Sequence, residues 1–229
     1  MRHGQVRAAV VVNATGPWCD ELRRLEDPSA RPLLRRTRGV HVMVRRERLG
    51  HTAGITLTSP IDGRVMFVLP WGDFSYIGTT DTDEPGPPEA AAPAEADVHY
   101  LLRSANACFP QAHLTEEDVV SSWAGVRALL DSGDAGSASS VSREHIIRRG
   151  PGGMFTIAGG KLTTFRSMAA ELVDEVAAEL TRREGRSRPD PAPTDTEPLP
   201  GGEAADLAPM RQTVLDLGLG AATADHLLQ

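Results

Sequence analysis

Cysteine, net positive charge and long apolar runs are all scarce in this 229-residue sequence, and each shortage excludes a class of protein. The two cysteines, Cys19 and Cys108, lie far apart and form no CxxC pair, which predicts a reducing compartment and no metal site. The net charge of −7 gives no reason to expect general affinity for nucleic acid. No run of about 18 apolar residues occurs, so no membrane-spanning helix is predicted.

Three sequence signals are also absent. The first four residues, Met1 to Gly4, lead straight into an expected strand, so we predict no signal peptide there. A GxGxxG dinucleotide fingerprint occurs nowhere in the chain, and no internal repeat is found. The length still allows one large domain or parts of two, with a buried core.

The most informative stretch is Gly159 to Arg166, with the sequence Gly-Gly-Lys-Leu-Thr-Thr-Phe-Arg. It follows a short apolar run, Met154–Ala158, and opens the longest helical pattern, Leu162–Arg182. Two glycines let the backbone approach a ligand, and a helix start offers unpaired N–H groups and partial positive charge. Taken alone, the stretch fits either an anion site or a plain turn with a solvated lysine.

The N-terminal part predicts one edge of an open α/β sheet. Val6–Asn13 has the continuous apolar run of a buried parallel strand, and Pro17–Leu25 is expected to form a short helix. Between them, small residues and Gly16 turn the chain, as at many ligand-binding edges of such sheets. The Pro- and Arg-rich segment 27–36 is expected to be a connection.

Residues 39–80 predict an antiparallel meander. In Gly39–Val44 the valines alternate with His41 and Met43, so the two sets face opposite sides of a strand. Two further runs, Ile55–Ser59 and Arg64–Leu69, flank an Asp-Gly pair typical of a hairpin. A second turn leads into Phe74–Gly78. His41 by itself fits a core or surface histidine as well as a catalytic one.

The remaining segments carry simpler patterns. They predict, in order, an exposed acidic loop at 81–93, a helix at 94–108, a helix-start turn at 115–118, a strand at 119–129, a Gly/Ser/Asp loop at 131–140, paired strands at 142–149 and 154–158, a linker at 183–202, and weak helical spacing from 206 onward.

Several blocks, in this order, resemble the FAD-dependent glycerol-3-phosphate dehydrogenase family, among the D-amino-acid-oxidase-like flavoproteins. The blocks are Val11 to Trp18, Gly39-Val40-His41, Phe67 to Trp71, Ile77 to Asp81, Gly125-Val126-Arg127, Ser142 to His145 and Gly159 to Arg166. The chain departs from the family pattern at Arg38, Ala128 and Phe165, where the family usually has lysine, proline and tyrosine.

The resemblance implies an α/β fold in which an α+β substrate domain rests on part of a Rossmann-like FAD domain. The mixed sheet would include the antiparallel meander, and the helical C terminus would be truncated. The expected domains are residues 1–37 and 151–182 for FAD, 38–150 for the substrate, 183–202 as a linker and 203–229 as the start of a helical domain. The N-terminal FAD fingerprint is not among them, so we expect a fragment that alone binds FAD poorly and is inactive.

The resemblance further implies oxidation of sn-glycerol 3-phosphate to dihydroxyacetone phosphate, with hydride transfer to FAD and electrons passed to a quinone. His41 matches the site histidine, a natural base for removing a hydroxyl proton. Arg143 matches a phosphate-binding arginine, and Arg127 and Lys161 match cations that polarise the C2 oxygen or hold the substrate. The FAD contacts would come from Ala14, Thr15, Gly16, Trp18, Gly159, Gly160, Lys161, Leu162, Thr163 and Thr164.

The family also implies a cytoplasmic location, with a peripheral contact on the inner face of the membrane and a homodimer as further options, and no nucleic-acid partner. Two alternatives stay open at this stage. The chain could be a non-catalytic or split-subunit module of the same fold, or a related flavin oxidase acting on amino or hydroxy acids. An assay of sn-glycerol 3-phosphate against such acids separates the flavin oxidase from the glycerol-3-phosphate dehydrogenase.

Overall fold

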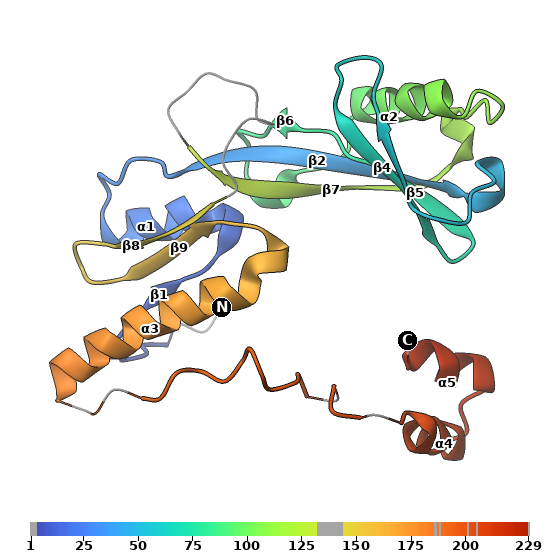
Figure 1. The fold of residues 1–229 in the computed structure, drawn as a ribbon. Helices are drawn as coiled ribbons and strands as arrows, with labels where there is room; N and C mark the ends of the chain where they lie inside the picture. Colours follow the sequence, from blue (N-terminus) through green and yellow to red (C-terminus); the bar gives the residue numbers. More distant parts are fainter. Residues whose placement is uncertain are drawn as a thin grey trace. The chain divides into compact units, whose positions relative to one another are not determined.

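The computed structural model describes residues 4–131, 144–185, 187, 189–200, 202–204 and 206–228. These residues form two compact units, Met1–Arg186 and Ser187–Gln229. The first unit contains two sheets, which Figure 1 shows with the helices that accompany them. The expected α/β class, with a mixed sheet, an antiparallel sheet and a short helical C terminus, is confirmed.

The larger sheet is antiparallel and has six strands. They are β2 (Leu34–Arg45), β3 (Ile55–Thr58), β4 (Val65–Trp71), β5 (Phe74–Gly78), β6 (Thr82–Asp83) and β7 (Val119–Leu130). Strand β2 is central: β7 pairs along one edge, while β5 and β6 pair in turn along the other. The predicted meander and its hairpins are therefore confirmed.

One face of this sheet carries the main core. Val40, Val42 and Val44 of β2 are fully buried, and helix α2 (Glu95–Cys108) covers them with Leu101 and its neighbours (Figure 1). His41 and Met43 face the other side, because successive side chains of a strand alternate. The alternation in the sequence thus sorts core residues from candidate site residues.

We predict that Leu101→Ala lowers the free energy of unfolding by about 2–5 kcal/mol, because a fully buried leucine leaves both lost burial and a cavity. Val65→Ala is the control, since that side chain is 54% exposed, and it should change stability by about 0.5 kcal/mol or less. Urea unfolding followed by tryptophan fluorescence measures both. Equal effects would show that α2 does not cover the core as described.

The smaller sheet has the order β1-β9-β8, formed by β1 (Val12–Asn13), β9 (Phe155–Gly159) and β8 (His145–Arg149). Strand β9 is parallel to β1 and antiparallel to β8, which confirms the predicted pairing of the two C-terminal strands. A 3-10 turn, η1 (Gly16–Trp18), and helix α1 (Cys19–Glu26) follow β1. After β9 come the 3-10 turn η6 (Leu162–Thr164) and helix α3 (Phe165–Glu184).

The prediction of a buried strand over Val6–Asn13 was wrong in its extent. Only Val12 and Asn13 form β1, and Val6 is 90% exposed. Strand β1 ends the sheet order with β9 as its one partner, so among the described residues no second neighbour covers the apolar run. Hydrophobicity predicted a strand here, but burial depends on neighbours that a local pattern does not contain.

Two segments of the large sheet differ from the predicted secondary structure. Strand β2 begins at Leu34, inside the expected connection, and runs through the expected domain boundary at 37/38. The acidic segment 81–93 is largely exposed, as predicted, but it is not all loop: it includes β6 and a 3-10 turn, η3 (Pro88–Ala90), and the Asp81 side chain is only 6% exposed. Its carboxylates bind β2 and β7 arginines, as in Arg38–Glu84 at 2.9 Å.

The other elements match the sequence patterns more closely. Of two further 3-10 turns, η2 (Arg46–Arg48) lies between β2 and β3, and η4 (Glu116–Asp118), before β7, is the expected helix-start turn. The predicted loop at 131–140 lies outside the described residues except for Asp131. In the second unit, α4 (Ala208–Asp216) and α5 (Ala221–Leu227) are joined by an Arg211–Asp225 ion pair at 2.6 Å. No helix among the described residues is long and apolar enough to cross a membrane.

Helix α3 is tied to the small sheet by one carboxylate. Glu179 is buried, and Arg182, Arg149 of β8 and Arg183 all donate to it. Hydrogen bonds from Arg182 and Arg149, in that order, lower the pKa of Glu179 from 4.5 to about 2. A lowered folded-state pKa means that this carboxylate stabilises the fold fully above pH 4.5 and loses its effect as the pH falls toward 2.

We therefore predict that Glu179→Gln lowers the melting temperature at pH 7 and flattens its decline between pH 4.5 and 2. Glu175→Gln, at an exposed position of the same helix, is the control and should keep the pH profile of the unsubstituted chain. Circular dichroism melts at stepped pH values measure this. Identical profiles for both variants would exclude Glu179 as the acid-sensitive anchor.

Candidate active site

The pairing of β2 with β7 arranges the candidate residues on the face of the large sheet opposite α2. Going along the two strands, His41 faces Trp123, Gly39 faces Gly125 and Thr37 faces Arg127. Paired residues of antiparallel strands project from the same face, and so do residues two apart along one strand. His41 and Arg127 therefore share a face, with a pair of glycines between them.

The His41 imidazole is held among aromatic rings. It stacks on the Trp123 ring, with centroids 5.4 Å apart and planes 13° from parallel, and Tyr76 of β5 meets it edge-on at 6.0 Å. On its third side the ring lies against Gly78, where a Cβ atom would come within 3.0 Å of the imidazole carbons. The ring is thus packed by side chains on two sides and by bare backbone on the third.

Arg127 reaches across β2. Its guanidinium donates to Thr79 Oγ1 at 2.9 Å, to the Thr80 carbonyl at 3.2 Å and to Asp81 Oδ1 at 3.3 Å. These acceptors lie between β5 and β6, on the opposite edge of β2 from β7. The side chain crosses β2 at Gly39, where a Cβ atom would come within 3.0 Å of the guanidinium.

This packing lowers the pKa of His41 below its ordinary 6.5. Burial of the ring is the larger cause, because it disfavours the charged form, and the positive charge of Arg127 is the second. The imidazole is consequently neutral at pH 7 and has a nitrogen lone pair available for a proton. A neutral imidazole beside a fixed cation can remove a hydroxyl proton while the cation stabilises the oxygen left behind.

We predict that Arg127→Gln raises the pKa of His41 toward 6.5, because the substitution removes the repulsive charge and leaves the burial largely in place. The control is Arg149→Gln, in which the lost guanidinium belongs to the Glu179 cluster on the other sheet. Proton NMR titration of the His41 C2–H signal gives the value directly. If Arg127→Gln leaves the titration unchanged, the two groups are not neighbours.

The glycine–lysine stretch forms the expected strand-to-helix junction. Gly159 ends β9, and Gly159 and Gly160 have φ of 78° and 83°, in the left-handed region that favours glycine. A side chain on Gly159 would also strike the Glu144 carbonyl at 2.5 Å. Lys161 follows, exposed, and its N–H points to Thr164 Oγ1 at 3.4 Å. Lys161 is the one lysine in the 229-residue sequence.

The Asn-Ala-Thr-Gly-Pro-Trp turn is built around Asn13, a residue that the sequence analysis did not single out. Asn13 is fully buried; its amide donates to the Cys19 carbonyl at 2.9 Å and it accepts from Thr15 Oγ1 at 2.7 Å. Gly16 has φ of 57°, and Trp18 donates through Nε1 to Glu89 at 3.0 Å. A lone polar residue at the end of an apolar run was the available signal for Asn13.

The two turns lie at one edge of the small sheet. Because β1 and β9 are parallel, with Asn13 beside Thr156, the turn that starts at Ala14 and the one at Gly159 leave the same ends of neighbouring strands. Ligands of open α/β sheets bind at the carboxyl ends of the strands. The structure thus brings His41 and Arg127 together on the large sheet and places Lys161 at the end of the small one, and Arg143 lies outside the described residues.

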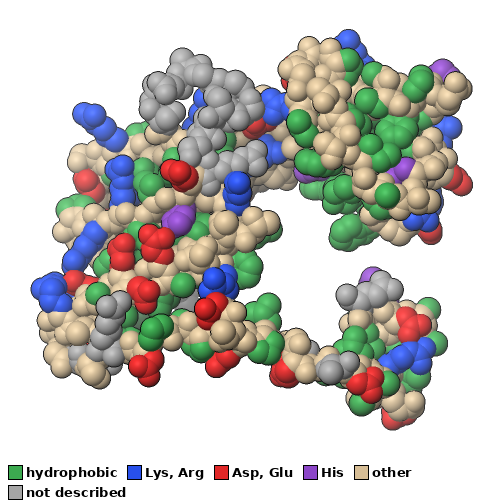
Figure 2. All heavy atoms as spheres, in the orientation of Figure 1, with side chains coloured by type: hydrophobic (Ala, Val, Ile, Leu, Met, Phe, Trp, Pro, Cys, Tyr) green, Lys and Arg blue, Asp and Glu red, His purple; other side chains and the backbone are tan. Residues whose placement is uncertain are grey.

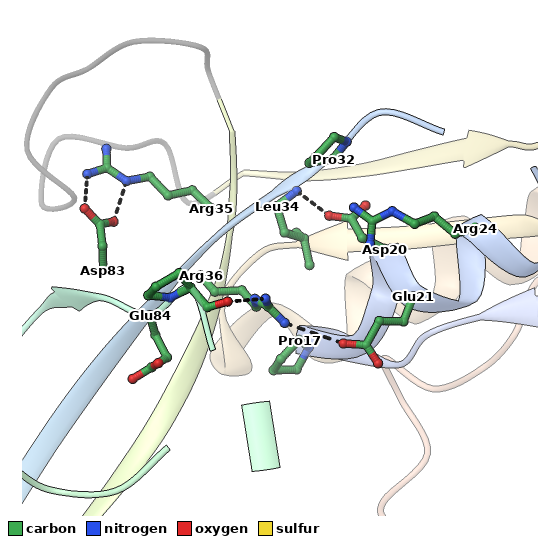
Figure 3. A pocket seen from close by; sticks show the side chains of 11 residues that line it. Pro17, Asp20, Glu21, Arg24, Pro32, Leu34, Arg35, Arg36, Asp83 and Glu84 are labelled. Carbon is green, nitrogen blue, oxygen red and sulfur yellow. Dashed lines mark hydrogen bonds and ion pairs between the residues drawn. The ribbon is translucent and has the colours of Figure 1, made fainter. Parts of the chain in front are cut away.

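A pocket of about 380 Å³ lies elsewhere, between α1, the start of β2 and residues 83–85 (Figure 3). Two ion pairs lie within its walls, Arg35–Asp83 at 2.8 Å and Arg36–Glu21 at 3.6 Å. None of the residues predicted for catalysis or cofactor binding lines it. We interpret it as a gap in the packing between α1 and the large sheet.

The comparisons with known proteins agree with this architecture. Residues 1–175 match the family model described as DAO, FAD dependent oxidoreductase. The chain belongs to this family. Two similar curated proteins are both named aerobic glycerol-3-phosphate dehydrogenase. The one from Staphylococcus haemolyticus is 35% identical over 204 residues, which are 89% of this chain and 36% of the relative. The one from Staphylococcus aureus strain USA300 is 36% identical over 180 residues, which are 79% of this chain and 32% of the relative.

Two solved structures extend the likeness to the fold. The glycerol-3-phosphate dehydrogenase from Bacillus halodurans complexed with FAD is 33% identical, with a TM-score of 0.78, and the match covers 97% of this chain and 42% of that one. The amino acid oxidase NikD is 14% identical with a TM-score of 0.51, which is a likeness of fold alone. The chain spans about a third of the length of the curated relatives it matches.

The junction at Gly159–Thr164 fits the isoalloxazine end of a flavin. Two glycines without side chains and the first N–H groups of the following helix suit a planar ring that gains negative charge on reduction. Leu162, 89% exposed, and the exposed Phe165 add apolar surface at the same place. The described residues thus fit an edge of the FAD expected from the family, at a sheet end separate from the His41 aromatic cluster.

Proposed function

We propose that this chain carries the substrate-binding part of a FAD-dependent glycerol-3-phosphate dehydrogenase, which oxidises sn-glycerol 3-phosphate to dihydroxyacetone phosphate. The observation that carries the proposal is the pairing of His41, with its lowered pKa, and the anchored Arg127 on one sheet face. The names of the relatives supply the substrate, because nothing in the described residues distinguishes it from other small hydroxy compounds.

In this proposal His41 accepts the proton of the C2 hydroxyl, a role for which a neutral imidazole at physiological pH is suited. Arg127 donates to the same oxygen as negative charge develops on it, and its anchor at Thr79–Asp81 keeps the guanidinium in place while this happens. The Trp123 and Tyr76 rings contact the imidazole and hold its orientation. The phosphate is assigned to Arg143, whose planar fork matches phosphate oxygens, and to Lys161.

FAD, when bound, would supply the acceptor for the hydride that leaves C2. The residues assigned to hold it are Ala14, Thr15, Gly16 and Trp18 at one turn and Gly159 to Thr164 at the other. We further propose a quinone as the electron acceptor, a cytoplasmic location with peripheral contact on the inner face of the membrane, and a homodimer. These finer assignments rest on the resemblance stated from the sequence.

The test uses a flavin-loaded protein that contains this chain. We predict that His41→Ala lowers kcat by about 10²- to 10⁴-fold, as expected for loss of a general base, and that Arg143→Ala mainly raises KM. His99→Ala is the control, because His99 is exposed on α2 and pairs with Glu116. Steady-state kinetics with a quinone analogue measures both parameters. The reverse pattern would overturn the two roles.

The substrate assignment is tested on the same protein with a panel of compounds. We expect flavin reduction by sn-glycerol 3-phosphate and little reduction by glycerol, D-amino acids or 2-hydroxy acids. Faster reduction by the acids would instead make the protein a related flavin oxidase.

A further inference from the structure

Three glycines line the sheet face between His41 and Arg127. Gly39 lies in β2, Gly78 ends β5 and Gly125 lies in β7, and the strand pairing places Gly39 opposite Gly125 and Gly78 opposite His41. None of the three has a positive φ, so backbone conformation does not require glycine at any of them. Another reason must account for the missing side chains.

At two of these positions the reason is space for a functional side chain. A Cβ atom on Gly39 would come within 3.0 Å of Nη1, Nη2 and Cζ of Arg127, and one on Gly78 would do the same to three atoms of the His41 ring. Real Cβ atoms do not approach this closely, so the guanidinium and the imidazole lie directly on bare backbone. An alanine at either position would lift the side chain above it.

At the third position the space is open. A Cβ atom on Gly125 would meet no atom of the described residues within 4 Å. Yet Gly125 lies between Trp123 and Arg127 along one strand and beside Gly39 on the next, on the face that carries both candidate catalytic groups. A small residue in unoccupied space beside a base and a cation is where a compact ligand fits.

The far end of Arg127 is fixed independently. Asp81, 6% exposed, accepts from Arg127 at 3.3 Å and from Arg64 at 3.2 Å, so one buried carboxylate holds two guanidiniums. Arg64 in turn pairs with Asp62, which accepts from Tyr100 Oη of α2 at 2.8 Å. This series of contacts joins the guanidinium that crosses β2 to the helix on the opposite face of the sheet.

We propose that Gly39, Gly78 and Gly125 form a side-chain-free floor, on which Gly39 and Gly78 position Arg127 and His41 and above Gly125 the reacting carbon of a small phosphorylated alcohol lies. The ligand part of this proposal rests on the proposed function. It makes Gly125 a specificity residue: any side chain there takes up the space between base and cation. In both Gly39-Val40-His41 and Gly125-Val126-Arg127, the glycine then lies on the same sheet face as the functional side chain two residues later.

The experiment compares the same substitution on the two facing residues. Gly39→Ala moves the end of a flexible side chain, so the chain should still fold, and the pKa of His41 should rise because the Arg127 charge is displaced. In the flavin-loaded protein kcat should fall about 100-fold, the effect expected of a misplacement of about 1 Å. Gly125→Ala should leave the pKa of His41 unchanged and raise KM for sn-glycerol 3-phosphate at least tenfold.

A second pair of variants tests the anchor without altering a glycine. Asp81→Asn keeps the shape of the side chain but removes the charge that holds Arg127, and kcat should fall. Asp83→Asn is its control, because Asp83 pairs with Arg35 on the surface and should retain kcat. Circular dichroism establishes that all four variants are folded.

The outcomes separate the floor from the proposed function. The pKa of His41 is measured by NMR without any substrate, so an unshifted value in folded Gly39→Ala overturns the floor, whatever compound is oxidised. Unchanged KM in Gly125→Ala overturns the placement of the ligand. A shifted pKa in Gly39→Ala, with no oxidation of sn-glycerol 3-phosphate by the unsubstituted protein, overturns the proposed function and supports the positioning role of Gly39.

Discussion

The guanidinium of Arg127, lying across β2 and bonded to residues 79–81, is the interaction on which the candidate site depends. It connects the two edges of the central strand, brings a fixed positive charge beside His41, and requires glycine at the point where it crosses. A charged side chain packed on bare backbone keeps its hydrogen bonds while most of its surface is removed from water. That arrangement makes the sheet face chemically useful as well as stable.

The strand pattern around this site could be predicted from the sequence because it is local. Alternation in Gly39–Val44 gave the two faces of β2, and the Asp-Gly turn gave the hairpin that precedes β5. The longer start of β2 could not be predicted in the same way, because it pairs with the end of β7, far along the chain, where Leu34 lies opposite Leu130. Asp81 was assigned to an exposed loop for the same reason. Ion pairs between distant segments leave no periodic pattern in the sequence from which they could be predicted.

Glycines show the limit of sequence patterns most clearly. Gly159 and Gly160 were singled out because glycine lets the backbone approach a ligand, and their φ values of 78° and 83° add a second reason, a left-handed backbone. Gly39 and Gly78 serve a different need, space for a neighbour's side chain, which the sequence does not distinguish from the first. Hydrophobic side chains gather visibly around the large sheet in Figure 2. Beside the His41 ring and the Arg127 guanidinium, by contrast, the sheet presents glycines without side chains.

The chain belongs to the FAD-dependent oxidoreductase family, and the proposed function divides its chemistry between the two sheets. In that proposal the small sheet offers glycines and a helix start to the cofactor, and the large sheet offers a base and a cation to the substrate. The most direct test is a crystal structure of a flavin-loaded protein containing this chain with sn-glycerol 3-phosphate bound. The account predicts the C2 oxygen about 3 Å from both the His41 ring and the Arg127 guanidinium, above Gly125. A ligand bound away from that glycine, with His41 and Arg127 both untouched, would contradict it.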